Sequence, residues 1–233
     1  GLAPRARMDV LLRFADLVQR HSDELALLET LDMGKPISDV LNIDLPEVQK
    51  TIRYFAECID KIEGAVTHTA PEALHMILHE PLGVVGLIVP WNFPLVITSW
   101  KTAPALAAGN TVVLKPAEQS PLSALRLAEL ASEAGLPDGV FNVVPGYGET
   151  AGRALGLNPD VDCLAFTGST AVGKKLAQAA ALWVMPPVAV KLGLVAAFLF
   201  ASGVCLCAVL CCACGAAMGR RRLSQGVALL AAA

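Results

Sequence analysis

The feature that most constrains the fold is an alternation of short apolar runs with amphipathic stretches, from residue 84 to about residue 181. The apolar runs read VVGLIVP, TVVLKP, FNVVPG and CLAFTGS, and a helix-like stretch follows each of them. Continuously apolar strands that alternate with helices are typical of a parallel sheet covered on both faces. The sequence therefore predicts an α/β fold with a partial Rossmann-like parallel sheet and flanking helices. Right-handed crossovers in such a sheet place a bound nucleotide at the carboxyl ends of the strands.

A helical segment and a β-hairpin are expected before this alternation. Up to about Gly64 the pattern is helical, with one apolar stripe at three- and four-residue steps. The stretch ALHMILHEPLGVVGLIVP has β-rich runs on either side of Pro81 and Gly83, which predicts two strands joined by a turn. The residues of the helical stripe are Val48, Ile52, Phe55, Ile59 and Ile62.

The first two strand-end loops carry polar side chains that suit a nucleotide-dependent reaction. In VPWNFP two prolines stiffen a turn that presents Trp91 and Asn92, and an Asn amide there can donate to a developing oxyanion. Taken alone, it fits a turn-stabilising side chain equally well. In LKPAEQSP, Lys115 ends a strand and Glu118 follows before a helix start, where a carboxylate can accept both ribose hydroxyls. The alternative for this pair is a surface ion pair.

The next two loops are rich in glycine and hydroxyl groups. VPGYGETAG contains Gly148 in a G-x-G pattern, which permits close backbone approach but is a weak signal. In FTGSTAVG, Gly168 and Ser169 lie at a strand-to-helix junction, where backbone N–H groups and a helix N-terminus suit a pyrophosphate. The alternative is an ordinary Ser or Thr helix cap.

The ordered succession of PWNFP, AGNTVVLKPAEQSP, GLPDGVFNVVPGYG and FTGSTAVG resembles the aldehyde dehydrogenase superfamily, over residues 1–181. That family oxidises an aldehyde to a carboxylic acid with NAD(P)+, using a Cys nucleophile and a Glu base. By resemblance, Asn92 is expected to be the oxyanion-hole amide. The residues expected by resemblance to contact the cofactor are Trp91, Lys115, Glu118, Gly148, Gly168 and Ser169.

The resemblance also implies partners. NAD is expected rather than NADP, because a 2′-phosphate beside Glu118 would meet like charge. The stretch ALHMILHEPLG resembles the family's oligomerisation hairpin, which implies a homo-oligomer in intact relatives. A small aldehyde is the expected substrate, and neither a nucleic acid nor a metal is expected. No signal peptide is recognisable at the N-terminus, so a cytoplasmic body is expected, with Cys58 and Cys163 as reduced core thiols.

The sequence departs from the family where the catalytic pair is expected. In place of the family's ELGGK, the chain reads VAVKLGLVAA, with Lys191 at the position of the Glu. The nearest match to the nucleophile motif is SQGVAL, which puts Leu229 where the Cys belongs. The sequence therefore predicts a truncated family member that is inactive as written. The aldehyde pocket is expected in residues that the chain does not contain.

Residues 182–233 are expected to form an apolar tail unrelated to the family. The chain's net charge is −3, yet no acidic residue follows Asp162, and the 27 residues from Leu192 to Met218 carry no charge. Five of the seven cysteines lie in CLCAVLCCAC, whose apolar frame argues against activated thiolates and a metal cluster. A transmembrane helix over residues 192–218 fits the length of a bilayer crossing. The other alternative is translated non-coding or out-of-frame sequence. If the tail is a real segment, a nucleotide-binding or oligomerising module held at a membrane is the alternative function.

Overall fold

The computed structural model describes residues 2–70, 73–184 and 206–208. Its centre is one five-stranded sheet with the order β5-β4-β3-β6-β7. The first four strands in this order are parallel and the fifth, β7, runs antiparallel to β6. The predicted parallel α/β sheet is confirmed. The strands are β3 (Val84–Ile88), β4 (Thr111–Lys115), β5 (Phe141–Val143), β6 (Cys163–Gly168) and β7 (Leu206–Ala208).

The strand register follows from the apolar runs. Leu87 of β3 lies between Leu114 of β4 and Ala165 of β6. All three side chains are buried, as expected for a parallel sheet that is covered on both faces. The four parallel strands therefore end at one edge of the sheet.

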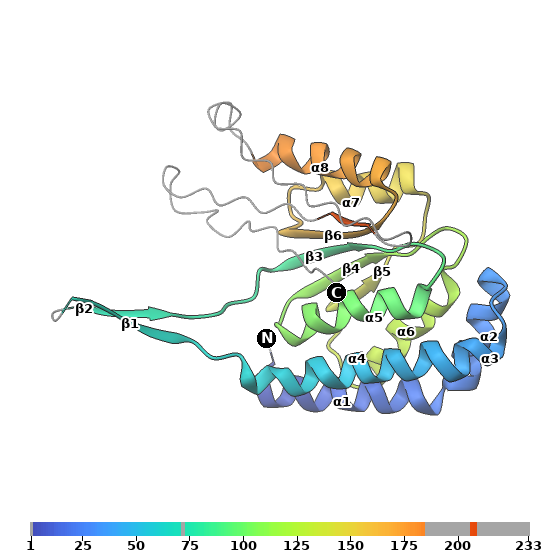
Figure 1. Ribbon diagram of the computed structural model, residues 1–233, viewed down its shortest axis with the longest axis horizontal. Helices are drawn as coiled ribbons and strands as arrows, with labels where there is room; N and C mark the ends of the chain where they lie inside the picture. Colours follow the sequence, from blue (N-terminus) through green and yellow to red (C-terminus); the bar gives the residue numbers. More distant parts are fainter. Residues whose placement is uncertain (1, 71–72, 185–205, 209–233) are drawn as a thin grey trace.

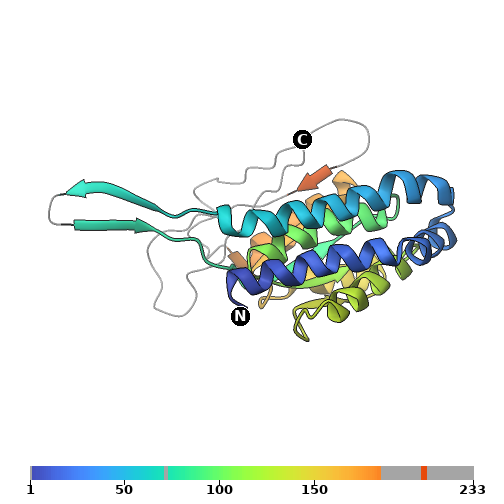
Figure 2. The ribbon, with the colours of Figure 1, turned by 90° about the horizontal axis from the view of Figure 1, so that it is seen from below.

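Helices cover both faces of the sheet (Figure 1), with α7 and α8 on one face and α5 and α6 on the other. The long helices α1 and α4 pack side by side and form a further layer below α5 and α6 (Figure 2). The helices that follow the strands are α5 (Pro94–Ala107), α6 (Leu122–Glu133), α7 (Arg153–Leu157), which continues the π-helical turn η3 (Gly148–Gly152), and α8 (Thr170–Val184).

The helical segment predicted before the sheet is present. Val48 and Ile52 of the predicted stripe are fully buried, and Ile59 is buried too. Ile62 departs from the prediction because the helix ends before it, and its exposed fraction is 53%. The segment comprises α1 (Pro4–Arg20), α2 (Ser22–Met33), α3 (Ile37–Asp39), the π-helical turn η1 (Val40–Asp44), α4 (Leu45–Cys58) and the 3₁₀ turn η2 (Ile59–Lys61).

A β-hairpin projects away from the body (Figures 1 and 2), formed by β1 (Ala65–Ala70) and β2 (Ala73–Ile77). The turn predicted at Pro81 and Gly83 is wrong as a hairpin turn, because β2 pairs with β1, whereas β3 joins the parallel sheet. The first hairpin strand reads AVTHTA, whose three consecutive polar residues leave little apolar signal. Its partner carries the apolar side chains, so the sequence pointed to only half of the hairpin.

No disulfide joins Cys58 and Cys163, and Cys163 is buried whereas Cys58 is half-buried. No helix of the described residues is long and apolar enough to cross a membrane. Of the candidate span 192–218, only Leu206–Ala208 belong to the described part of the chain. They form β7 rather than the predicted helix, since their backbone groups pair with the outer edge of β6. The rest of that span lies outside the described residues.

Candidate active site

The strand order places a topological switch point at the carboxyl ends of β3 and β6. The chain leaves β3 towards α5 on one face of the sheet and leaves β6 towards α8 on the other (Figure 1). The two loops therefore diverge, as at the switch point where open α/β sheets bind ligands. Ile88 of β3 pairs with Phe166 of β6, so the loop with Trp91 and Asn92 begins next to Gly168.

The loop after β3 presents the predicted Trp91 and Asn92. Trp91 has an exposed fraction of 53%, whereas Asn92 is half-buried. The Ser120 hydroxyl donates to the Trp91 carbonyl oxygen over 3.4 Å and so ties this loop to the loop after β4. The loop is thereby fixed by a contact between neighbouring strand ends.

The loop after β4 holds the predicted Lys115–Glu118 pair. Lys115 Nζ lies 3.0 Å from Glu118 Oε2, and the side chains are 4% and 37% exposed, respectively. A hydrogen bond from its own backbone N–H, and then the Lys115 ammonium, hold the pKa of Glu118 below its usual range. An ionised carboxylate with an open side is therefore presented at the carboxyl end of β4.

Gly148 begins the η3 turn that carries the chain from β5 across the sheet edge to α7. A Cβ on Gly148 would meet no atom within 4 Å, so its α-carbon borders open space. A few residues later, the α-carbon of Gly152 faces Ile88 and Lys115, with 3.9 Å between a Cβ there and each side chain. The turn thus lies against the strand ends that hold the other predicted residues.

Gly168 and Ser169 lie at the junction of β6 and α8. A Cβ on Gly168 would approach the Phe166 ring to 2.5 Å, so packing within the chain already requires glycine here. The Ser169 hydroxyl accepts a hydrogen bond from the Val172 N–H over 3.4 Å. This is the helix-cap geometry that the sequence left open as an alternative. The N-terminus of α8 lies directly after the carboxyl end of β6, and a helix start is a position that suits an anion.

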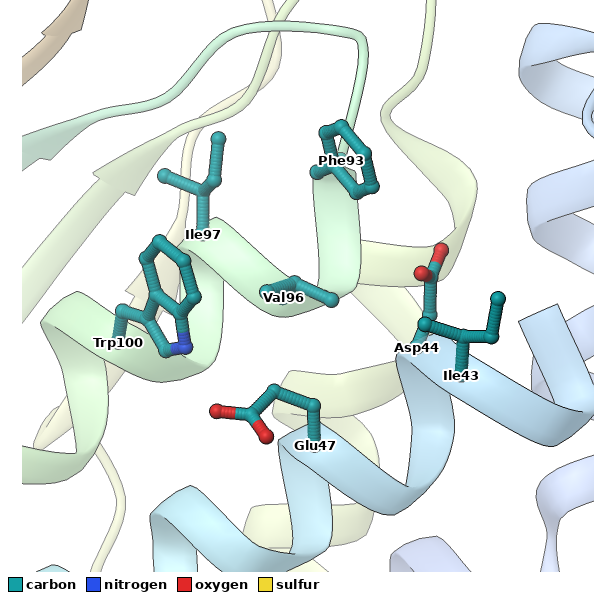
Figure 3. A pocket seen from close by; sticks show the side chains of 7 residues that line it. All are labelled: Ile43, Asp44, Glu47, Phe93, Val96, Ile97 and Trp100. Carbon is teal, nitrogen blue, oxygen red and sulfur yellow. The ribbon is translucent and has the colours of Figure 1, made fainter. Parts of the chain in front are cut away.

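A pocket of about 270 Å³ lies beside the Asn92 loop, between α4 and α5 (Figure 3). Its lining is apolar except for two carboxylates, and Glu47 extends its side chain towards Trp100 in Figure 3. The pocket was not among the sequence expectations, which assigned the aldehyde pocket to absent residues. The sequence feature that could have revealed this pocket is the three- and four-residue spacing in FPLVITSW, which puts four large apolar side chains on one helix face. They are Phe93, Val96, Ile97 and Trp100. The lining residues are Ile43, Asp44, Glu47, Phe93, Val96, Ile97 and Trp100.

Behind the pocket lies a buried ionic group that the sequence analysis also missed. Lys35 forms an ion pair with Asp44 and lies over the Phe93 ring, with Nζ 3.9 Å from its centroid. Glu29 is completely buried in the same place. The sequence feature that could have revealed this group is Glu29 itself, an acidic residue on the apolar face of α2, four residues after the buried Leu25.

A doubly covered parallel sheet with this set of strand-end loops is typical of the α/β folds that bind a nucleotide at the carboxyl ends of their strands. A sequence model of the aldehyde dehydrogenase family matches residues 1–218, and the chain belongs to that family. This range continues past residue 181, where the motif resemblance stopped.

Among curated proteins, the chain is 59% identical over 174 residues to the NADP/NAD-dependent aldehyde dehydrogenase PuuC of Escherichia coli, covering 75% of this chain and 35% of that protein. It is 54% identical over 178 residues to aminoacetaldehyde dehydrogenase of Pseudomonas aeruginosa, covering 76% and 36%. The chain thus spans little more than a third of the length of these relatives.

Solved structures of aldehyde dehydrogenases also resemble this chain. The γ-glutamyl-γ-aminobutyraldehyde dehydrogenase of Burkholderia cenocepacia has a TM-score of 0.76 at 58% identity, over 78% of this chain and 37% of that one. An indole-3-acetaldehyde dehydrogenase in complex with NAD+ has a TM-score of 0.77 at 53% identity, over the same shares of the two chains.

Proposed function

We propose that this chain is the NAD+-binding portion of an enzyme that oxidises aldehydes to carboxylic acids. The observation that carries the proposal is the ionised, partly exposed Glu118, which Lys115 holds at the carboxyl end of β4. A carboxylate in this position suits the two hydroxyls of an adenosine ribose and disfavours a 2′-phosphate. The relatives include an NADP/NAD-dependent dehydrogenase and an NAD+ complex, which supports a nicotinamide cofactor here.

The remaining predicted residues are assigned around this anchor. Trp91 lines the cofactor channel, and Gly148 borders the adenine side, where open space adjoins its α-carbon. Gly168, Ser169 and the N-terminus of α8 take the pyrophosphate. When bound, NAD+ supplies the hydride acceptor. Asn92 donates its amide to the oxygen of the aldehyde carbonyl as negative charge develops there.

The pocket beside Asn92 is proposed as the aldehyde site within this chain. It adjoins Asn92 through Phe93, and its apolar lining suits an alkyl or aryl tail. Glu47 has no hydrogen-bond or ion-pair partner among the described residues, so its carboxylate is available to a cationic tail. Two relatives are named for amino-aldehydes or their γ-glutamyl derivatives, which supports a nitrogen-bearing tail.

We further propose that the chain by itself does not turn over aldehydes, because Lys191 and Leu229 stand where the family has its Glu base and Cys nucleophile. Both residues lie outside the described part of the chain. Lys191 falls inside the range matched by the family, whereas Leu229 falls beyond it. The proposal that residues 182–233 are foreign to the family rests on the same departures.

The alternative of a membrane-held module stays a prediction from the sequence, and nothing in the described residues favours it. Oligomerisation through the hairpin is proposed from its exposed apolar side chains, which include Val66, Leu74 and Met76.

Calorimetric titration of the purified chain with NAD+ tests the main proposal. Binding is expected, together with its loss in Glu118→Ala, while Glu133→Ala on the outer surface of α6 serves as the matched control. A chain that folds cooperatively and binds no NAD+ would contradict the proposal. Turnover of an aldehyde panel by the wild-type chain would contradict the proposed inactivity alone.

A further inference from the structure

Helix α5, which follows Asn92 directly, begins without a cap of its own. Its N-cap residue is Phe93, whose side chain cannot accept a hydrogen bond. The acceptor comes instead from α2, because the Leu95 N–H donates to Glu29 Oε2 over 3.1 Å. The start of α5, and with it the Asn92 loop, is therefore held by a carboxylate 66 residues away in sequence.

Glu29 is placed where a negative charge is costly. Its side chain is 0% exposed, and its second oxygen, Oε1, has no hydrogen-bond partner among the described residues. The groups that face it are Lys35, with Nζ at 4.0 Å, Asp44, and the N-terminal peptide groups of α5. Lys35 forms its close ion pair with Asp44 rather than with Glu29.

One proton on the Glu29–Asp44 pair would balance the charges of this buried group. Two buried carboxylates share one ammonium, so one negative charge is left over when both are ionised. If Glu29 carries a proton, its second oxygen has a hydrogen to donate to the Asp44 carboxylate, while Oε2 still accepts from Leu95. Burial, opposed by the Leu95 hydrogen bond, together with the charge and hydrogen bonding of Asp44, raises the pKa of Glu29 to about 7.

The same group reaches the Asn92 loop from a second side. Gly34, with φ of +78°, ends α2 and reverses the chain so that Lys35 returns towards Asp44. Lys35 then lies over the Phe93 ring, next to Asn92. Glu29 is therefore connected to the loop both through its hydrogen bond to the start of α5 and through Lys35 above Phe93.

We propose that Glu29 and Asp44 share one proton. Together with Lys35, this pair positions the Asn92 loop, and the position of the loop changes when the pair gains or loses its proton. Glu29 is in this sense a positioning residue, since it acts on Asn92 through α5. The inference rests on the proposed function only in assigning Asn92 of this loop a role in binding the aldehyde oxygen. The shared proton and its effect on the loop are independent of cofactor and substrate.

The first experiment measures the proton directly in the wild-type chain. The carboxyl ¹³C resonance of Glu29 is followed from pH 4 to pH 9, and it is assigned as the signal missing in Glu29→Gln. A midpoint near 7 is expected. A midpoint near the ordinary value for Glu, about 4.3, would overturn the shared proton.

The second experiment reads out the loop. The chain is labelled with fluorotryptophan, and the ¹⁹F resonance of Trp91, assigned by Trp91→Phe, is followed over the same pH range. It is expected to shift with the midpoint of Glu29 and to lose this shift in Glu29→Gln, which keeps an acceptor for Leu95 but cannot titrate. A Trp91 resonance that ignores the Glu29 titration would overturn the positioning role.

Two variants separate this role from general damage to the fold. Asp44→Asn keeps the shape of the group but removes the proton-sharing partner, so the midpoint of Glu29 is expected to fall. Asp32→Asn changes the neighbouring cap on α6 and is expected to leave the Trp91 titration unchanged. Because NAD+ binding is measured separately, loss of one result does not imply loss of the other.

Discussion

At the scale of single residues, the backbone N–H of Glu118 and then the Lys115 ammonium hold the pKa of the partly exposed Glu118 carboxyl below its usual range. Because the pKa of Glu118 is lowered, its charge persists into mildly acidic solution. The ability to discriminate against a 2′-phosphate is therefore expected to persist there too.

The variant Glu118→Gln tests this discrimination. At the proposed ribose site, this change would remove the charge that opposes a 2′-phosphate and would weaken the hydrogen bonds to the ribose, so NAD+ affinity is expected to fall by about tenfold. NADP+ affinity is expected to fall less or to rise. Calorimetry with both cofactors measures the ratio of the two dissociation constants, with Glu129→Gln as the control. An unchanged ratio would remove Glu118 from the proposed ribose site.

Burial of Glu29 predicts a pH-dependent stability. Its pKa is raised to about 7 in the folded chain, so the folded state binds more protons than the unfolded state between about pH 4.3 and pH 7. The stabilisation is therefore complete at low pH and is lost as the pH rises through 7. Urea unfolding across this range should show Glu29→Gln gaining up to about 4 kcal/mol relative to the wild type. A difference between the two proteins that is constant with pH would contradict this prediction.

Glu47 predicts the charge preference of the pocket beside Asn92. Its half-buried carboxylate faces an apolar lining with Trp100, which suits an alkylammonium ion. The ¹⁹F resonance of Trp100 in the labelled chain is expected to respond to butylammonium more strongly than to neutral butanol. In Glu47→Gln this difference should disappear, whereas Lys50→Gln, an exposed position on the same helix, should retain it. Equal responses in the wild type would argue against a cationic tail.

At the scale of elements, α2 caps two helices at once. Glu29 accepts from Leu95 at the start of α5, and Asp32 Oδ2 accepts from the Leu122 N–H over 2.7 Å at the start of α6. The two acids are three residues apart and so lie on one face of α2. Neither α5 nor α6 has a capping side chain of its own. The helices that follow β3 and β4 are thus fixed by one element outside the sheet.

Asp32→Ala is expected to lower the free energy of unfolding by about 1 kcal/mol, because the Leu122 N–H loses its acceptor. Partial burial raises the pKa of Asp32, so the loss is expected to shrink when the solution is acidic enough to protonate this carboxyl. Urea denaturation monitored by circular dichroism measures the change, with the exposed Lys50→Ala on α4 as the control. An effect no larger than that of the control would show that water replaces the cap.

At the scale of the whole molecule, the β1–β2 hairpin extends from the body with apolar side chains on its surface (Figure 1). Among the described residues, Val66, Leu74 and Met76 are at least half exposed. A two-stranded hairpin that stands alone is marginal in water, so a second copy of the chain is the expected cover.

Light scattering coupled to size-exclusion chromatography tests whether a second copy of the chain covers the hairpin. The wild-type chain is expected to form a dimer or a larger assembly. Leu74→Glu with Met76→Lys is expected to shift it to the monomer without affecting NAD+ binding. A matched pair of changes on the body surface, Tyr54→Glu with Leu31→Lys, should leave the assembly intact. A wild-type monomer at all concentrations would contradict an oligomerising role.

The sequence by itself determined the parallel sheet and the edge at which its loops meet. Local patterns suffice here, because each apolar run makes its own strand and parallel strands end together. Trp91, Lys115 and Ser169 could therefore be placed at one edge from strand ends alone. Glycine at position 168 is also required by packing, because a Cβ there would meet the Phe166 ring.

Only the tertiary structure decided which distant residues complete these loops. The N-cap positions of α5 and α6 are Phe93 and Pro121, which cannot cap, so nothing local shows where the acceptors come from. Folding brings Glu29 and Asp32 to them across 66 and 90 residues of chain. The hairpin pairing was likewise decided beyond local sequence, because the β1 strand carries little apolar signal. Local periodicity reports burial along one element, whereas the partner of a buried N–H group depends on how the elements pack.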